Sequence, residues 1–564
     1  MSKFWTKSSL AFLLLFFLFL AACSSDDNSN TSNAEDANTD EETEESTENE
    51  EEAKFGGELV VGMTADPDTL NPLVSNTTPG NWINSAIYPH LMMMNPEQTK
   101  VPYIAESVDV SDDGLEVTFT LREGLTWQDG EPITSEDVKF TGELLHEHQL
   151  QWTAEIFNMV ESVETPDDLT VTYKLSEPYP AFPGAIGYWV RIVPKHIWEE
   201  VEDPASFSNS DPVGAGPFKL ANWEKGQYVE LEAVDEWFAA PEGKPYLDKV
   251  TFRIYPDINT MVLALQSGEI DVTAQDIPTS TISQFEDDEK FEVVKTPSLG
   301  YAYFSFMLNP DEPSPTEDKN FRLAMATATD RESIINVALE GSAMNIDTPL
   351  SPIYSDWVNP DAKAPEYDLE KAAQILTDAG YEDTDSDGVL NAPEEFGGEN
   401  VVLDLTYDAA NSFHQKVARI LQSNAEEIGV SLNLDAVEYN TLSAKVMTEH
   451  DFDMHIGKWG AFDEPSETFN NLFNSEAALN FMELNDPTID ELGEGANYAA
   501  SEEEARDYVM QAQEWFVEEF PVVPIYVQEF NLVYNQEKFD GFEVYPSDLQ
   551  GLVDPSSLIQ VYQK

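Results

Sequence analysis

Acidic side chains between residues 383 and 394 have a spacing that suits cation binding. The segment reads Asp-Thr-Asp-Ser-Asp-Gly-Val-Leu-Asn-Ala-Pro-Glu, with glycine at the sixth position. This order matches a calcium loop, which offers hard oxygen ligands at positions 1, 3, 5, 7, 9 and 12. The candidate ligands are Asp383, Asp385, Asp387, the Val389 carbonyl, Asn391 and Glu394. We expect a structural Ca²⁺ here, and the alternative is an acidic turn without a metal.

Cys23 is the second group with distinct chemistry, because it is the single cysteine of the chain. Residues 1–22 join a basic start to an apolar run at 10–20, which is too short for a membrane span of roughly 20 residues. They therefore read as a secretion signal. Leu-Ala-Ala-Cys at 20–23 resembles the bacterial lipobox, in which the cysteine thiol is lipidated and becomes the new N-terminus. We expect a lipid anchor at Cys23, and the alternative is an ordinary cleavage site.

Residues 24–54 follow this cysteine and consist largely of Ser, Asn, Thr, Asp and Glu. Such a segment cannot bury enough apolar surface to offset its chain entropy. As a neutral coil it would reach about 30 Å, and further once its like charges repel. We predict a disordered acidic tether between a membrane anchor and a folded body.

The sequence offers little support for an enzyme. His146-Glu-His148 lacks the spacing of a zinc protease helix, and there is no Gly-x-Ser-x-Gly elbow and no complete phosphate-binding glycine loop. Pairs of carboxylates carry no meaning for glycosidase chemistry in a chain with 108 acidic residues. We expect no enzymatic activity, and an extracellular hydrolase is the rival from a different class.

Composition limits the partners and the size of the folded body. The formal net charge is −80, with only 28 basic residues, so clustered phosphate contacts and a nucleic-acid partner are excluded. A hydrophobic content of 41% is that of a globular protein with a real core. A body of this length is expected to divide into two or three domains.

Strand and helix patterns alternate along the body without a repeat. Predicted strands lie at 58–63, 116–121, 170–175, 228–233, 250–255 and 401–407. Predicted helices begin at a Ser135 N-cap and at Asp368, and occupy 414–429 and 501–518. The pattern predicts an α/β or α+β body in several lobes.

Residues 119–140, from Phe-Thr-Leu-Arg-Glu-Gly to Val-Lys-Phe, resemble the signature of the family 5 extracellular solute-binding proteins. These are the peptide and nickel receptors of ABC importers. Other blocks resemble the family in the same order, at 68–72, 213–218, 264–271, 322–331, 367–373, 452–454 and 459–460. Most blocks also have local physical explanations: Gly214-Ala-Gly-Pro suits a positive φ or a close approach of two backbones. We therefore interpret most signature residues as architectural.

The resemblance implies an α/β, bilobal periplasmic-binding-protein-like fold of type II, in the large peptide-binding class, with an extra subdomain. It implies closure of two lobes around a ligand. Carried across by resemblance, the boundaries give lobe I at 55–96, 207–308 and 528–564, the extra subdomain at 97–206, and lobe II at 309–527.

The resemblance also implies two ligand-facing segments. The expected ligand-binding residues are Asn76, Thr77, Thr78, Trp459, Gly460, Phe462 and Asp463. Peptide binders usually carry an aspartate three positions after the tryptophan, to pair with the peptide α-ammonium, and here that position is Phe462. Asp463 could replace it after a one-residue shift, or Asp463 begins a surface turn. Trp459 is either an aromatic wall of the site or a core residue.

These implications predict the substrate-binding lipoprotein of an ABC importer that captures oligopeptides. It would be a monomer, lipid-anchored at the extracellular face of the cell membrane, and would deliver its ligand to the transmembrane permease subunits. The alternatives within the receptor class are a nickel chelate, a sugar or a dipeptide as ligand. His455 would serve a nickel chelate, unless it is a packed strand histidine.

Overall fold

The computed structural model describes residues 55–95, 99–241, 243–308, 313–460, 464–546 and 550–564. Residues 52–564 form one compact unit. The predicted signal, Cys23 and the acidic tether lie outside the described residues, as do Phe462 and Asp463.

Within the described residues, twelve strands pair in one large sheet. Its first part contains β8 (Phe218–Glu224), β9 (Tyr228–Ala233), β10 (Lys249–Ile254), β1 (Glu58–Met63), β11 (Val272–Thr273) and β12 (Phe291–Pro297). β1 lies parallel to both β10 and β11, so it occupies the centre of this part. Leu59, Val61 and Met63 on β1 are fully buried, as a central strand requires.

The second part of the sheet contains β13 (Ala302–Phe306), β14 (Ala343–Asn345), β15 (Val402–Asp408), β16 (Ser431–Val437) and β17 (Met454–Lys458). β15 lies parallel to β16 over seven pairs and to β17 over two. The helix α10 (Ser412–Glu427) connects β15 to β16 and contacts both strands. This is the crossover that two parallel neighbours need.

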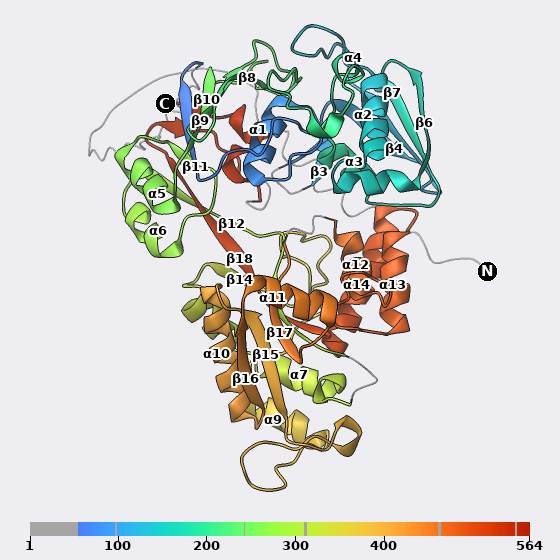
Figure 1. Ribbon diagram of the computed structural model, residues 1–564, viewed down its shortest axis with the longest axis vertical. Helices are drawn as coiled ribbons and strands as arrows, with labels where there is room; N and C mark the ends of the chain where they lie inside the picture. The colour runs from blue at the N-terminus through green and yellow to red at the C-terminus, as the bar shows by residue number, and fades with distance from the viewer. Residues whose placement is uncertain (1–54, 96–98, 242, 309–312, 461–463, 547–549) are drawn as a thin grey trace, which may run out of the picture. The chain divides into compact units, whose positions relative to one another are not determined.

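The strand β18 (Val522–Asn535) belongs to both parts (Figure 1). Its first half pairs with β13 and β14, and its second half pairs with β11 and β12. Two hydrophobic cores meet at this strand. One is built from buried residues within 59–274 and 532–561, and the other from buried residues within 301–527. The two largest hydrophobic cores of the described residues therefore share one strand.

Helices cover the second core. They include α7 (Lys319–Thr327), α9 (Leu369–Asp378), α12 (Thr468–Phe473), α13 (Pro487–Asn497) and α14 (Glu502–Glu519). Smaller helices accompany the first part of the sheet: α1 (Thr78–Ile87), α5 (Ile258–Ser267) and α6 (Thr279–Glu286). The N-cap Asp368 of α9 matches the sequence prediction, and α14 begins one residue after its predicted start at Ser501, which is its N-cap. Each of these two side chains accepts a backbone N–H of the first turn.

A second sheet of four strands packs on α2 (Ser135–His148). Its strands are β4 (Ala105–Val110), β5 (Glu116–Leu121), β7 (Thr170–Leu175) and β6 (Val160–Asp167), in this spatial order. Val117, Phe119 and Leu121 alternate into the core along β5, as the sequence pattern predicts. A two-stranded ribbon of β2 (Met92–Met94) and β3 (Lys100–Pro102) and the helix α3 (Phe182–Trp189) complete this region.

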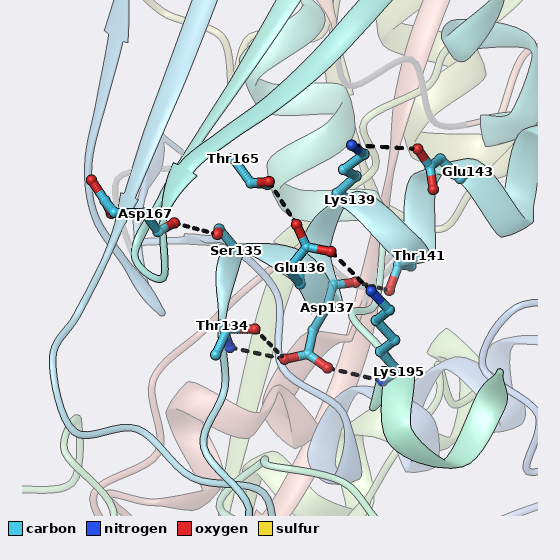
Figure 2. A network of polar contacts seen from close by, with 10 residues as sticks. All are labelled: Thr134, Ser135, Glu136, Asp137, Lys139, Thr141, Glu143, Thr165, Asp167 and Lys195. Carbon is cyan, nitrogen blue, oxygen red and sulfur yellow. Dashed lines mark hydrogen bonds and ion pairs between the residues drawn. The ribbon is translucent and has the colours of Figure 1, made fainter.

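The last part of the signature segment forms the start of α2, and Figure 2 shows the polar network there. The N-cap is Thr134, not Ser135 as the sequence suggested. The Thr134 amide and hydroxyl both donate to the Asp137 carboxylate, at 2.8 and 3.2 Å. These two residues form a capping box, which begins one residue before the predicted N-cap. Asp137 also accepts the Lys195 amide at 2.9 Å, and Glu136 pairs with the Lys195 ammonium at 2.8 Å. These signature residues join the start of α2 to Lys195.

Candidate functional site

A cavity of about 730 Å³ lies between elements of the two cores. One wall comes from β2, β3, β4 and the start of α3, and includes Met92, Lys100, Val108, Asp112, Tyr179 and Gly184. The other wall comes from a turn at 353–357, the residues after β17 and the start of α14, and includes Tyr354, Asp356, Trp357, Glu464, Glu502 and Arg506. A cavity of this size accommodates a small organic ligand.

An ion pair crosses this cavity wall between Lys100 and Glu464. The side chains are only 11% and 20% exposed, so little water screens the two charges. The pair lies on the surface of α3 at Gly184, where a Cβ would come within 2.7 Å of the Glu464 carboxylate. Glycine at 184 therefore leaves the space that the ion pair occupies.

Glu467 carries a second carboxylate, close enough to Lys100 for the two charges to interact. It ends a short 3₁₀ helix, Pro465–Glu467, and accepts a hydrogen bond from Asn471 at 3.4 Å. Burial raises the pKa of the Glu467 carboxyl to about 7, although the Lys100 charge and the Asn471 hydrogen bond act in the opposite direction. Glu464 is thus the carboxylate that contacts Lys100, and Glu467 feels the Lys100 charge only from a distance.

Arg506 on α14 supplies the second cation of the cavity wall. Its guanidinium lies over the ring of Trp357, at 5.2 Å from the ring centre, and donates to Glu502 at 2.6 Å. Glu502 stands one turn earlier on the same helix, so this is the favourable order of an (i, i+4) pair. Lys100 is placed in the same way, with Glu464 as its partner and the ring centre of Tyr188 5.8 Å from its ammonium.

The segment at Asn76, Thr77 and Thr78 forms the start of α1 and does not line the cavity. Thr77 is the N-cap of α1, and its hydroxyl donates to Asp68 at 2.8 Å. Burial would raise the pKa of Asp68, but hydrogen bonds from the Asn76 amide and from the Ser75 and Thr77 hydroxyls outweigh it and lower the pKa below its ordinary value. Asn76 and Thr78 are exposed. The loop is thus organised around Asp68, and its ligand contacts stay a prediction.

Trp459 and Gly460 extend from the end of β17 and do not line the cavity either. Trp459 is half-buried and stacks on Tyr303, with 6.0 Å between ring centres, so it packs against the second core on one side. Gly460 is exposed, and a Cβ there would meet nothing within 4 Å. The chain then leaves the described residues at 461–463 and returns at Glu464, in the cavity wall. Site roles for Trp459, Gly460, Phe462 and Asp463 stay predictions.

The sequence of this chain matches a known protein family, and this match identifies the fold. A model of bacterial extracellular solute-binding proteins, family 5 Middle, matches residues 99–481. The chain belongs to this family. The predicted family and the predicted bilobal periplasmic-binding-protein-like α/β fold are therefore confirmed, and the two cores joined by β18 agree with that fold.

Individual relatives of this family 5 protein cover almost its whole length. The oligopeptide-binding protein AppA of Bacillus subtilis (strain 168) is 29% identical over 503 residues, which are 87% of this chain and 90% of the relative. The probable D,D-dipeptide-binding periplasmic protein DdpA of Escherichia coli (strain K12) is 27% identical over 506 residues, covering 86% and 92% of the two chains.

Solved structures give the same result. The ABC transporter substrate-binding protein CtaP from Listeria monocytogenes has a TM-score of 0.76 and 28% identity, and the match covers 90% of this chain and 100% of CtaP. AppA from Bacillus subtilis in complex with a nonapeptide has a TM-score of 0.65 and 27% identity, with 91% and 100% coverage. Among the described residues, every helix is too short or too polar to cross a membrane.

His455 of this family 5 protein is a packed strand histidine. Its Nδ1 lies 3.1 Å from the Ser305 hydroxyl, and rings of Tyr303, Phe452 and Phe481 surround it with centres 5.5 to 5.8 Å away. Burial lowers its pKa to about 3, with a further contribution from His414, so the imidazole stays neutral. This packing does not favour a nickel chelate as ligand.

The acidic loop brings together three of its six predicted calcium ligands. Carboxylate oxygens of Asp383, Asp385 and Asp387 lie within 4.8 Å of one another, and all three side chains are exposed. The Asn391 side-chain oxygen instead accepts the amide and hydroxyl of Thr384, at 3.0 and 2.6 Å. Glu394 begins a separate 3₁₀ helix, Glu394–Phe396. The three carboxylates fit a hard cation, and the full set of ligands stays a prediction.

Sequence reasoning missed Lys100, Trp357 and Arg506 as parts of a cavity, and it also missed Glu467 close to that cavity. Each stands in a different element, so no local spacing connects them. The scarcity of basic residues is the one available signal. Among 108 acidic residues, each lysine or arginine has many possible carboxylate partners.

Proposed function

We propose that this family 5 protein is the substrate-binding component of an ABC importer and that it captures oligopeptides. The main support is its similarity, over 87% of the chain, to an oligopeptide-binding protein. A related structure at 27% identity contains a bound nonapeptide. The cavity between elements of the two cores adds a space in which a ligand would contact both.

The proposed mechanism is capture between two halves of the chain. A ligand that touches both cavity walls favours the arrangement in which the walls face each other, in proportion to the contacts it makes there. Peptides of different sequence share backbone groups and termini, which protein groups or bridging waters can satisfy. The bound peptide would then be handed to the transmembrane permease subunits unchanged, so no enzymatic step is proposed.

The ligand contacts proposed by resemblance remain Asn76, Thr77, Thr78, Trp459, Gly460, Phe462 and Asp463. Their support is the family membership of the chain and the position of Glu464, directly after Asp463, in the cavity wall. A carboxylate in this segment is suited to hold an α-ammonium group by a charge-assisted hydrogen bond.

The proposed location is the extracellular face of the cell membrane, through a lipid on Cys23 and the acidic tether at 24–54. The support is the lipobox-like order at 20–23 and a family of extracellular proteins. The protein would act as a monomer, divided at the boundaries given above. A Cys23→Ala variant should appear in the culture medium, whereas the wild-type protein should stay with the membrane fraction. Equal release of both proteins would contradict the anchor.

A structural Ca²⁺ bound by Asp383, Asp385 and Asp387 is part of the proposal. The support is the calcium-loop spacing and the proximity of the three carboxylates. The Val389 carbonyl, Asn391 and Glu394 would complete the set after a local rearrangement of the loop.

Native mass spectrometry of the purified protein tests the proposed function directly. We expect peptide masses that are released intact on denaturation, and we expect isothermal titration with synthetic peptides to show binding. Incubated peptides should be recovered at full length. Cleavage of the peptides would favour the hydrolase, and binding of a nickel chelate or a sugar with no peptide binding would favour another receptor.

A further inference from the structure

Two strands of the cavity wall built from β2, β3 and β4 present alternate side chains to the cavity. On β2, Met92 and Met94 line the cavity, and the residue between them does not. On β4, Val108 and Val110 line it, and again the residue between them does not. Successive side chains of a strand point to opposite faces, so one face of each strand is turned towards the cavity. On both strands that face is apolar.

Val110 has the most exposed side chain of these four residues. It is 48% exposed, whereas Met92 and Met94 are buried and Val108 is half-buried. Val108 packs against the first core, but Val110 packs against none of the hydrophobic cores formed by the described residues. An apolar side chain that lies in a cavity wall and outside every such core offers its surface to an apolar group of a ligand.

The opposite wall continues this apolar surface through Ile353, in the turn at 353–357. Ile353 is half-buried, lines the cavity and packs against a small hydrophobic cluster that includes Met94. Apolar residues of both walls therefore meet in one cluster. Methionine side chains also adapt to apolar groups of different shapes. We call Met92, Met94, Val108, Val110 and Ile353 the apolar strip.

We propose that the apolar strip is a side-chain subsite of the cavity and selects peptides that carry a bulky aliphatic side chain, such as that of leucine. The inference rests on the proposed function, because it names the class of peptide that the same protein would capture. The occupant is a ligand side chain and not a protein surface, because the strip lies inside a cavity of about 730 Å³ between two walls. Binding there is favourable in proportion to the apolar area that leaves water.

Titration calorimetry with two matched peptides tests the proposal. The peptides have one length and one sequence, except for a central leucine or asparagine. These two side chains have nearly the same branched shape, and both are uncharged, so the charged residues of the wall do not decide between them. We expect the leucine peptide to bind about tenfold more tightly, because more apolar surface is buried. The heat-capacity change of binding should also be more negative for the leucine peptide.

The variant Val110→Asn should reduce this preference to about threefold, because it replaces the most exposed apolar side chain of the strip by a polar one. The matched control is Val402→Asn on β15, outside the cavity wall, where the valine is 46% exposed against 48% for Val110. Both positions are exposed strand positions, so the two substitutions should affect folding alike, and the control should keep the full preference. The heat-capacity comparison needs the wild-type protein alone, so it tests the proposal even if a variant does not fold.

The outcomes separate this inference from the proposed function. Equal or tighter binding of the asparagine peptide by the wild-type protein would overturn the apolar subsite and leave peptide capture intact. A preference for leucine that survives Val110→Asn, or that falls equally in Val402→Asn, would overturn the subsite in the same way. Failure of both peptides to bind would overturn both proposals. A preference that falls only in Val110→Asn would support the inference.

Discussion

Lys100 and Glu464 form an ion pair although 364 positions separate them in the sequence. Lys100 stands at the start of β3, beside the four-stranded sheet, and Glu464 follows β17 of the second part of the large sheet. Their contact joins two walls of the cavity beside Gly184, which has no side chain to displace them. The pair therefore fixes the corner of the cavity next to the predicted ligand-binding segment.

Replacement of Glu464 by Gln should destabilise the protein by about 3 kcal/mol, because it leaves the nearly buried Lys100 without its counter-charge. Urea unfolding measures the change. The double variant Lys100→Met/Glu464→Leu is the control, and it should recover most of the loss, since it removes both charges together. Equal stability of Glu464→Gln and wild type would show that the pair contributes nothing.

Glu467 should make the stability of the protein fall as the pH rises. Its pKa is raised to about 7, so the folded protein keeps a proton there after the unfolded chain has lost it at about pH 4.3. The contribution is fully present below the unfolded value and is lost as the pH rises through 7. Glu467→Gln does not titrate, so the variant should gain about 1 kcal/mol over wild type at pH 5 and about 3 kcal/mol above pH 8.

The measurement for Glu467 is the difference between variant and wild type, since burial also raises the pKa values of Asp276 and Asp554 to about 6. These two carboxyls change the stability in the same direction with pH, and the difference cancels them. Glu131→Gln, at an exposed position, is the matched control for the loss of one carboxylate. A constant difference for Glu467→Gln across this pH range would disprove the prediction.

Gly214→Ala should destabilise the protein by about 1 to 3 kcal/mol through overpacking. A Cβ at this position would lie 1.9 Å from the Ile87 carbonyl oxygen, and this oxygen also accepts the amides of Ala215 and Gly216 at 3.0 and 2.7 Å. Backbone atoms cannot rotate away as a side chain can. Thermal unfolding measures the effect, with Gly460→Ala as the control, because a Cβ at 460 meets nothing. An unchanged melting temperature for Gly214→Ala would contradict the close approach.

Calorimetric titration of metal-stripped protein should show uptake of one Ca²⁺ by the acidic loop, together with a higher melting temperature. Asp385→Asn should weaken this binding at least tenfold, because it removes one of the three clustered carboxylates. Asp361→Asn, at an exposed position elsewhere in the second core region, should not. The absence of calcium uptake by the wild-type protein would leave the loop as an acidic turn without a metal.

The sequence predicts most of the regular elements whose pattern is local. The predicted strands at 58–63, 116–121, 170–175 and 228–233 coincide with β1, β5, β7 and β9, because alternating or continuous apolar residues decide these elements without help from distant parts. The predicted N-cap of α2 is one residue too late. Thr134 and Ser135 are both good caps, and the distant carbonyl of Asp167, which accepts the Ser135 hydroxyl at 2.6 Å, decides between them.

The candidate site is predictable only in part, because its geometry depends on contacts between distant elements. β18 carries no alternation that would reveal its two sets of neighbours, since ten of its residues are buried. Glu464 lies in a segment that the family resemblance indicates, but its partner Lys100 does not. The predicted roles of Asn76 and Trp459 stay predictions, and so do the domain boundaries.

The two cores share a continuous strand, and this has a mechanical consequence. Val527 belongs to the second core and Leu532 to the first, so only a few residues of β18 separate them. Between them, residues 529–531 of β18 pair with β12 on one side, and no strand of the described chain pairs with them on the other side. Rotation of one core against the other would therefore proceed as torsion of this backbone, spread over neighbouring peptide units. A proline at position 531 would fix one φ angle of this backbone and would also remove the hydrogen bond from the Asn531 amide to Asp276.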